Sequence, residues 1–106
     1  NEALLDRFPL TIRMDYLPRE VEVEVVMSKS GNNDRSVAER MVRVAEDVRA
    51  AMANDKVFCT FSTRRLIDWA RMATKFDPLE SARSTVLSKV SPFDAQVIED
   101  IIDNYF

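Results

Sequence analysis

The chain has 106 residues, of which 46% are hydrophobic and 31% charged, and this balance predicts a single globular domain. The net charge of −3 argues against nucleic-acid binding, and the absence of histidine excludes catalysis by a histidine base. The lone Cys59 excludes a disulfide scaffold, and the chain contains no apolar run of the roughly 18 residues that a membrane span needs. The N-terminal residues lack the pattern of a secretory signal, so we expect a cytoplasmic protein without a membrane partner.

The first sixteen residues predict the end of a helix followed by one strand. Residues 1–8 have the apolar spacing of a helix, and Pro9 stops it because proline cannot donate to the preceding turn. Residues 10–16 alternate between apolar and polar side chains, as in a half-buried strand. A single strand is not stable without partners, so we expect the rest of its sheet upstream, in a longer protein.

The next segment, residues 18–30, has a mixed pattern. Valine and glutamate alternate over residues 20–25, which is typical of a strand, but Pro18 suits the first position of a helix and Gly31 suits its left-handed end. We therefore expect a helix. Its three glutamates, Glu20, Glu22 and Glu24, are expected to form a solvated face rather than a cation site.

Helical spacing is clearest over residues 34–53, which Asn33 or Asp34 can cap and whose polar side includes Arg49. A loop with a short extended piece at 57–60 follows. Ser62 can then cap a helix over 62–76 that buries Trp69 and Phe76. Two further helices are expected to begin at Asp77-Pro78 and Ser91-Pro92, where an N-cap precedes a proline at the first helical position.

The residues available for chemistry are few. Gly31 is the only glycine, so this chain has no glycine-rich loop for phosphate and cannot bind a nucleotide by itself in the usual way. Cys59 is expected to be a small apolar residue rather than a reactive thiol. Three carboxylates near the C-terminus, Glu99, Asp100 and Asp103, are expected to be solvated, so we expect no metal site.

Four stretches together resemble the MoxR-like AAA+ proteins. They are N-E-A-L-L-D-R-F at 1–8, D-Y-L-P-R-E-V-E at 15–22, M-V-R-V-A-E-D-V-R-A-A at 41–51 and F-S-T-R-R-L-I-D-W-A at 61–70. Within that clade the likeness is greatest to the CbbQ/NirQ/NorQ C-terminal domain and to the small ATPase subunit of aerobic cobalt chelatase. The resemblance covers nearly the whole chain, and neither a Walker A nor a Walker B motif lies inside it.

The resemblance implies a mainly α fold, a lid bundle of about five helices preceded by one strand of the AAA+ core sheet. Residues 1–16 would end the ATPase core, and residues 17–106 would form the lid. The intact parent would be an ATP hydrolase that uses ATP and magnesium in a ring of identical subunits, commonly a hexamer. It would remodel or activate a partner protein or metal-chelatase complex. This piece alone should be inactive and hold no cofactor.

Arg7 matches the family's arginine finger, which one subunit projects toward the γ-phosphate held by its neighbour. Arginine suits that role because its planar, permanently charged fork matches phosphate oxygens and offsets charge as the phosphoryl group departs. Spacing alone favours a plainer interpretation, in which Arg7 is a charged neighbour of Asp6 on the wet side of a helix end.

Arg64 matches the second sensor, a lid arginine that contacts nucleotide within its own subunit or across the interface. It falls in the first turn after Ser62, at the positive end of a helix. The helical wheel turns its competitor, Arg65, toward Trp69 and the buried stripe. The plainer alternative for Arg64 is an exposed ion pair with Asp68 of little energetic consequence.

A second function remains open from the residues alone. The chain could be a free-standing helical adaptor that binds partner helices in an apolar groove and has no nucleotide role. A start codon directly before Asn1 would favour the adaptor, whereas G-x-x-x-x-G-K-[ST] upstream would favour the ATPase.

Overall fold

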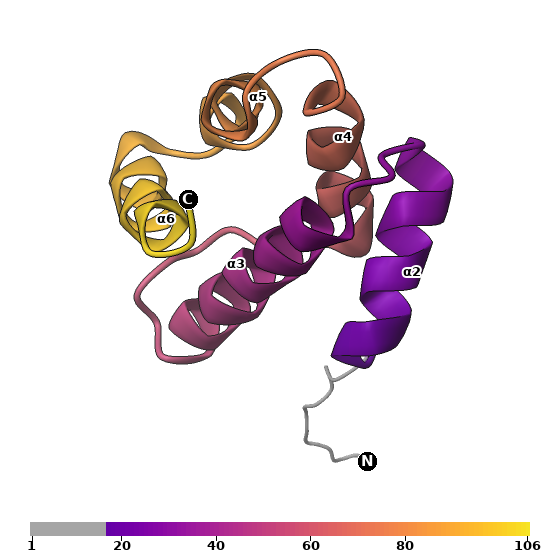
Figure 1. Cartoon of the computed structure of the whole chain (residues 1–106). Coiled ribbons are helices and arrows are strands. Elements are labelled where there is room, and N and C mark those ends of the chain that lie inside the picture. Colours follow the sequence, from indigo (N-terminus) through magenta and orange to yellow (C-terminus); the bar gives the residue numbers. More distant parts are fainter. Residues whose placement is uncertain (1–16) are drawn as a thin grey trace.

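The computed structural model describes residues 17–106, and this part of the chain is mainly helical, as predicted. The described residues form five α-helices and one short 3₁₀-helix (Figure 1). The predicted helix end and strand at 1–16 lie outside them. In chain order the elements are α2 (Arg19–Ser30), α3 (Arg35–Ala53), α4 (Thr63–Met72), α5 (Pro78–Thr85), η1 (Leu87–Lys89) and α6 (Pro92–Asp103).

The helix boundaries follow the capping residues of the sequence. Asp34, Ser62, Asp77 and Ser91 each accept a hydrogen bond from a backbone N–H two or three residues further on, which satisfies a donor that the helix itself leaves free. Gly31 ends α2 with a φ of 79°, and its N–H donates to the carbonyl of Met27. The helix predicted for residues 18–30 is thus confirmed, with Pro18 at the cap rather than at the first helical position.

The hydrophobic core lies around α3, which contacts α2, α4 and α6 (Figure 1). The largest fully enclosed side chains are Trp69, Phe61 and Met41. Trp69 also donates from Nε1 to the carbonyl of Pro78 at 2.9 Å, so its polar edge is satisfied where α4 meets α5. This confirms Trp69 as a core residue.

Two local predictions are wrong. Helix α4 ends at Met72 rather than at residue 76, because the backbone N–H groups of residues 74–76 bond back in a turn. Phe76 therefore leaves the buried stripe of the helix and is 50% exposed. Residues 57–60 form an irregular loop, and no strand occurs in the part of the chain that the structure describes. Val57 anchors that loop in the core, whereas Phe58 is 77% exposed.

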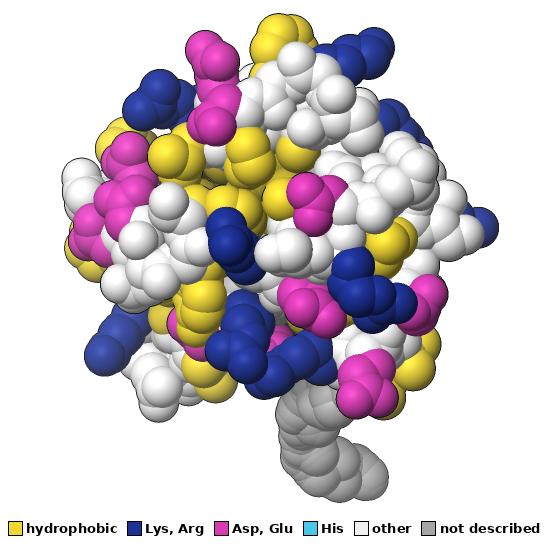
Figure 2. All heavy atoms as spheres, viewed as in Figure 1, with side chains coloured by type: hydrophobic (Ala, Val, Ile, Leu, Met, Phe, Trp, Pro, Cys, Tyr) yellow, Lys and Arg dark blue, Asp and Glu magenta, His cyan; other side chains and the backbone are white. Residues whose placement is uncertain are grey.

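Figure 2 shows hydrophobic side chains gathered between α5, α6 and α3 on one face, ringed by side chains of both charges. Within residues 17–106, none of the helices combines the length and the apolar character needed to cross a membrane.

Candidate functional site: the start of helix α4

Arg64 is the second residue of α4 and its side chain is exposed. The side chain lies between two grooves on the surface. The larger one has a volume of about 370 Å³ and the smaller one about 210 Å³. The larger is lined by Lys29, Thr63, Arg64, Ile67, Asp68 and Arg71, and the smaller by Ser62, Arg64, Arg65, Asp68, Thr85 and Lys89. Arginine and lysine thus outnumber carboxylates in both grooves.

The ion pair considered for Arg64 does not form. Asp68 instead lies 3.7 Å from Nη1 of Arg71, and no carboxylate among residues 17–106 pairs with Arg64. Arg65 is half-buried, and its Nη1 atom is enclosed without a hydrogen-bond partner among the described residues. The wheel therefore placed the two arginines correctly: Arg64 faces solvent and Arg65 leans inward.

Beneath this surface lies a buried ion pair that sequence reasoning missed. The guanidinium of Arg49 on α3 donates from Nη1 and Nη2 to the two carboxylate oxygens of Glu22 on α2, at 2.9 and 2.7 Å. The side chains are 8% and 1% exposed. The prediction of a solvated face for Glu22, and that of an outward position for Arg49, are wrong. Glu20 and Glu24 are exposed as predicted.

The same cluster holds the first residues of α4. Thr63 donates its hydroxyl to Glu22 Oε2 at 2.8 Å, and Arg49 Nε donates to the carbonyl of Phe61 at 2.8 Å. These two anchored residues stand on either side of the cap Ser62. The start of α4, and with it the backbone of Arg64, is therefore held to α2 and α3 by hydrogen bonds to a buried ion pair.

A signal for this cluster was present in the sequence. On a helix, Glu22 stands four residues before Val26 and eight before Ser30, and all three are buried. On α3, Arg49 follows Val48 and lies four residues after Ala45, on the buried stripe. The alternation of valine and glutamate over residues 20–25 has a strand-like period of two residues, which masks the helical spacing of Glu22 with Val26 and Ser30.

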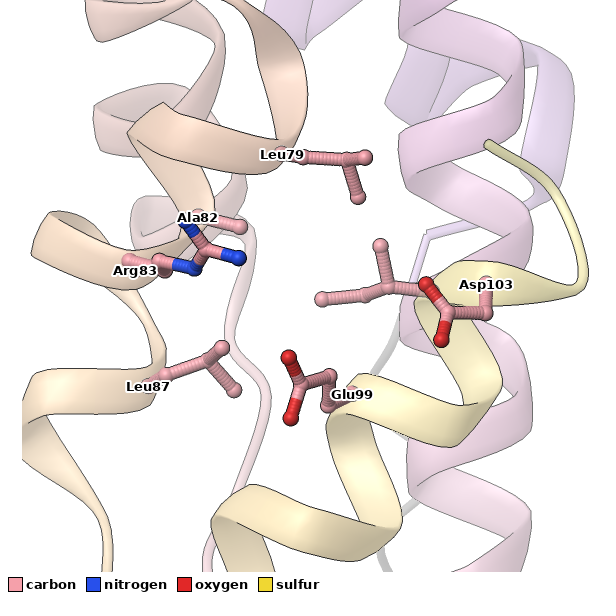
Figure 3. Close-up of a pocket in the computed structure, with 7 residues that line it drawn as sticks. Leu79, Ala82, Arg83, Leu87, Glu99 and Asp103 are labelled. Carbon is pink, nitrogen blue, oxygen red and sulfur yellow. The ribbon is translucent and has the colours of Figure 1, made fainter.

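One small cavity near a cation is a poor phosphate site. A cavity of about 40 Å³ between α5 and α6 is bordered by Arg83, but Glu99 and Asp103 border it too (Figure 3). It is too small for a phosphate group with its oxygens, and two carboxylates would repel one. Two other grooves, of about 250 and 450 Å³, are also lined by arginines, but their lining side chains sum to +1 each, against +2 for each groove at α4. Among the described residues, the start of α4 is therefore the best candidate for anion binding.

The remaining candidates from the sequence are the Cys59 thiol, a metal site and Arg7. Burial raises the pKa of the Cys59 thiol, and nearby Asp94 raises it further, which makes the thiol a weak nucleophile. This agrees with the prediction of an unreactive cysteine. Within residues 17–106, no group of His, Cys, Asp and Glu side chains could hold a metal ion. Arg7, the predicted arginine finger, lies outside the described residues.

Comparison with known proteins fits this arrangement. Residues 22–104 match the model of the CbbQ/NirQ/NorQ C-terminal family, so the match includes both halves of the buried ion pair and all of α4. The chain is also 31% identical over 105 residues to the aerobic cobaltochelatase subunit CobS of Sinorhizobium sp. That alignment covers 94% of this chain and 32% of CobS, so the chain spans about a third of its relative's length. The chain belongs to the CbbQ/NirQ/NorQ C-terminal family, the C-terminal part of CbbQ- and CobS-like MoxR AAA+ proteins.

Proposed function

We propose that this chain is the lid of an AAA+ ATPase and that Arg64 binds the phosphates of its nucleotide. In this proposal residues 1–16 end the ATPase core, and residues 17–106 form the lid. The observation that carries it is the setting of Arg64: an exposed guanidinium without a carboxylate partner in residues 17–106, at a helix start that a buried ion pair fixes in place. A permanently charged fork on a rigid base suits the recognition of phosphate oxygens.

The lid would turn nucleotide chemistry into motion. When water attacks the γ-phosphoryl group and the bond to the β-phosphate breaks, Arg64 loses or changes its contact with phosphate, and the helices anchored to it move together. Arg7 would act across a subunit boundary, so that hydrolysis depends on an assembled ring. Through that motion the parent would remodel or activate a partner protein; the resemblance to a cobaltochelatase subunit supports a metal-chelatase complex as that partner.

Substitution of the two arginines in the full-length protein tests this function. Arg64→Ala should weaken binding of a non-hydrolysable ATP analogue by about tenfold, because a charge-assisted contact of this kind contributes about 1.4 kcal/mol or more. Arg7→Ala should leave binding unchanged and lower hydrolysis in assembled rings by roughly 10³-fold or more, as for other arginine fingers. Lys75→Ala is the control, since Lys75 is an exposed cation outside both grooves.

Two results would contradict the proposal. One is an Arg64→Ala protein with the ATP affinity of the Lys75→Ala control. The other is an Arg7→Ala protein that hydrolyses ATP in rings at the wild-type rate.

The adaptor function keeps one observation in its favour. Phe58 and Phe93 are 77% and 62% exposed, and Asp94, the neighbour of Phe93, accepts hydrogen bonds from the backbone N–H of Phe58. Exposed aromatic residues on two neighbouring segments are typical of protein contacts. An adaptor would lose its partner on substitution of Phe58 and Phe93 and would be indifferent to Arg64→Ala.

A further inference from the structure

The cavity between α5 and α6 has an apolar floor and opens to the surface. Leu79 and Ala82 of α5, Leu87 of η1 and Ile102 of α6 line it. Ala82 and Ile102 are each 1% exposed, whereas Leu79 is 37% exposed. The volume of about 40 Å³ has room for about three water molecules, or for the end of one aliphatic side chain. It lies on the face where Figure 2 shows hydrophobic side chains between these helices.

Charged side chains of opposite sign border the cavity from its two sides. Arg83 belongs to α5, and Glu99 and Asp103 belong to α6. In Figure 3 the guanidinium of Arg83 and the carboxylate of Glu99 both point into the space between the two helices. Among the described residues, no ion pair joins Arg83 to either carboxylate, so no salt bridge closes the opening. The three charges sum to −1, in a chain whose net charge is −3.

The two helices turn one face each toward this cavity. Residues three and four positions apart border it from each helix: Leu79, Ala82 and Arg83 on α5, and Glu99, Ile102 and Asp103 on α6. Residues with that spacing lie on one face of a helix. However, α5 and α6 make few direct contacts with each other, and each contacts η1 instead. The two rows of side chains therefore leave space that a third element can enter.

An α-helix suits this surface better than an extended segment does. No strand occurs among residues 17–106, so this part of the chain offers no sheet edge to the backbone of an extended partner. A helix satisfies its own backbone hydrogen bonds and packs its side chains between the rows of its neighbours. One leucine or isoleucine of such a helix would fill the cavity beside Leu79 and bury apolar surface.

The charges around the cavity indicate what should flank that side chain. Two carboxylates on α6 face one guanidinium on α5, so lysine or arginine of a partner would lie against Glu99 and Asp103. A second copy of this chain is a less favourable partner, because two chains of net charge −3 repel each other. The surface therefore fits a helix that is apolar along one stripe and basic beside it.

We propose that the cavity between α5 and α6 is the docking site for a basic amphipathic helix of a partner protein. The helix inserts one leucine or isoleucine between Leu79 and Ile102 and places lysine or arginine against Glu99 and Asp103. Because it contacts α5 and α6 at once, it holds these two helices together. The interaction uses neither Arg64 nor a nucleotide. That the helix belongs to the protein that the ATPase remodels rests on the proposed function.

The test measures binding of a synthetic helical peptide to the chain of residues 1–106. The peptide carries a stripe of leucines spaced three and four residues apart and lysines beside it. A peptide of the same composition in scrambled order has the same charge but no apolar stripe. Fluorescence anisotropy of the labelled peptides at physiological ionic strength gives the affinities. We expect the striped peptide to bind about tenfold more tightly or better, with saturating NMR amide shifts at residues 79–87 and 99–103.

Two variants separate the apolar contribution from the charged one. Leu79→Ala should weaken binding of the striped peptide about 3- to 10-fold, because a partly exposed apolar wall of the cavity is lost. Asp103→Asn should weaken it about 3-fold, because one of the two facing carboxylates is neutralised. The control is Asp100→Asn, since Asp100 is an exposed carboxylate on the same helix that does not border the cavity. Unchanged amide shifts elsewhere verify that each variant is folded.

Three results would overturn the inference. The first is equal affinity for the striped and the scrambled peptide. The second is a Leu79→Ala or Asp103→Asn chain that binds the striped peptide as the Asp100→Asn control does. The third is a change of the amide shifts at residues 79–87 and 99–103 with protein concentration alone, which would show that a second copy occupies the cavity. Each of these leaves the role of Arg64 to be judged by nucleotide binding to the full-length protein.

Discussion

The two parts of the bundle are held together by different kinds of contact. In α2, α3 and α4, polar side chains cross from one helix to another: Arg49 to Glu22, Thr63 to Glu22 and Arg19 to Glu46. In α5 and η1, by contrast, the hydroxyl groups bond back to carbonyls of their own segment, as those of Ser81, Ser84, Thr85 and Ser88 do.

The difference indicates that α2, α3 and α4 form the more rigid part of the bundle, called the frame below. Hydrogen bonds that cross between helices fix their relative positions. A buried ion pair joins α2 to α3, whereas α5 and the C-terminal end after α6 are joined to the other helices by single bonds, from Trp69 to the Pro78 carbonyl and from Tyr105 to Asp47, and otherwise by apolar packing. Apolar packing is non-directional, so α5 and α6 can shift against the frame at smaller cost. Arg64 stands on the frame and Lys89 on the more adjustable part.

The strongest way to break this contrast is to remove the buried carboxylate. Glu22→Ala should destabilise the fold by about 3–5 kcal/mol, because it takes away the charge that two nitrogens of buried Arg49 contact. Chemical denaturation monitored by circular dichroism measures this loss.

The chain offers a matched control for that change. Arg19 and Glu46 also join α2 to α3, with the same separation of 27 residues, but on the exposed surface. Glu46→Ala should leave the denaturation midpoint close to that of the wild type, since water and salt screen the pair. If Glu22→Ala and Glu46→Ala lower the free energy of unfolding equally, burial does not make the Glu22–Arg49 pair more important for stability than the exposed pair.

A smaller loss of stability is expected from shortening a buried apolar side chain of α6. Ile98 on α6 is fully enclosed, and Ile98→Val removes a single methylene group. The expected loss is about 0.5–1.5 kcal/mol, in the same denaturation experiment, because the neighbouring helices can partly close the space. A loss as large as that for Glu22→Ala would mean that α6 is packed as rigidly as the frame.

The smallest effect concerns pH. The phenol of Tyr105 donates to Asp47 Oδ2 at 2.7 Å, and this hydrogen bond raises the pKa of Tyr105 above its ordinary value of 10.0. The folded chain then holds the phenolic proton more tightly than the unfolded chain. The stability that this bond contributes is fully present below pH 10 and is lost as the pH rises through the raised pKa.

NMR titration of the Tyr105 ring measures that pKa directly. The variant Asp47→Asn should bring it back toward 10, and Tyr105→Phe should remove this contribution to the loss of stability at high pH. A Tyr105 pKa that does not respond to Asp47→Asn would show that the hydrogen bond is not its cause.

The sequence predicted where helices start better than it predicted which side chains are buried. Caps such as Asp34 and Ser62 act on backbone donors within three residues, so local spacing is sufficient to find them. The helical spacing of Glu22 with Val26 indicates its burial, but its partner Arg49 stands 27 residues away, and no local pattern reveals that the two pair. Phe76 was misplaced because the helical stripe was continued past the turn that ends α4.

The candidate site was predictable in part for the same reason. The exposure of Arg64 and the inward lean of Arg65 follow from the helical wheel, which depends on α4 alone. Lys89 could not be predicted as its neighbour, because the two residues meet only through the packing of α4, α5 and η1. The role of Arg7 remains a prediction from the resemblance.

The most direct test of the account is a structure of the full-length protein with a non-hydrolysable ATP analogue and magnesium. We expect the guanidinium of Arg64 to lie within hydrogen-bond distance of a phosphate oxygen, with Glu22 and Arg49 still paired beneath it. An ATP-loaded assembly in which Arg64 points into bulk water in every subunit would contradict the account.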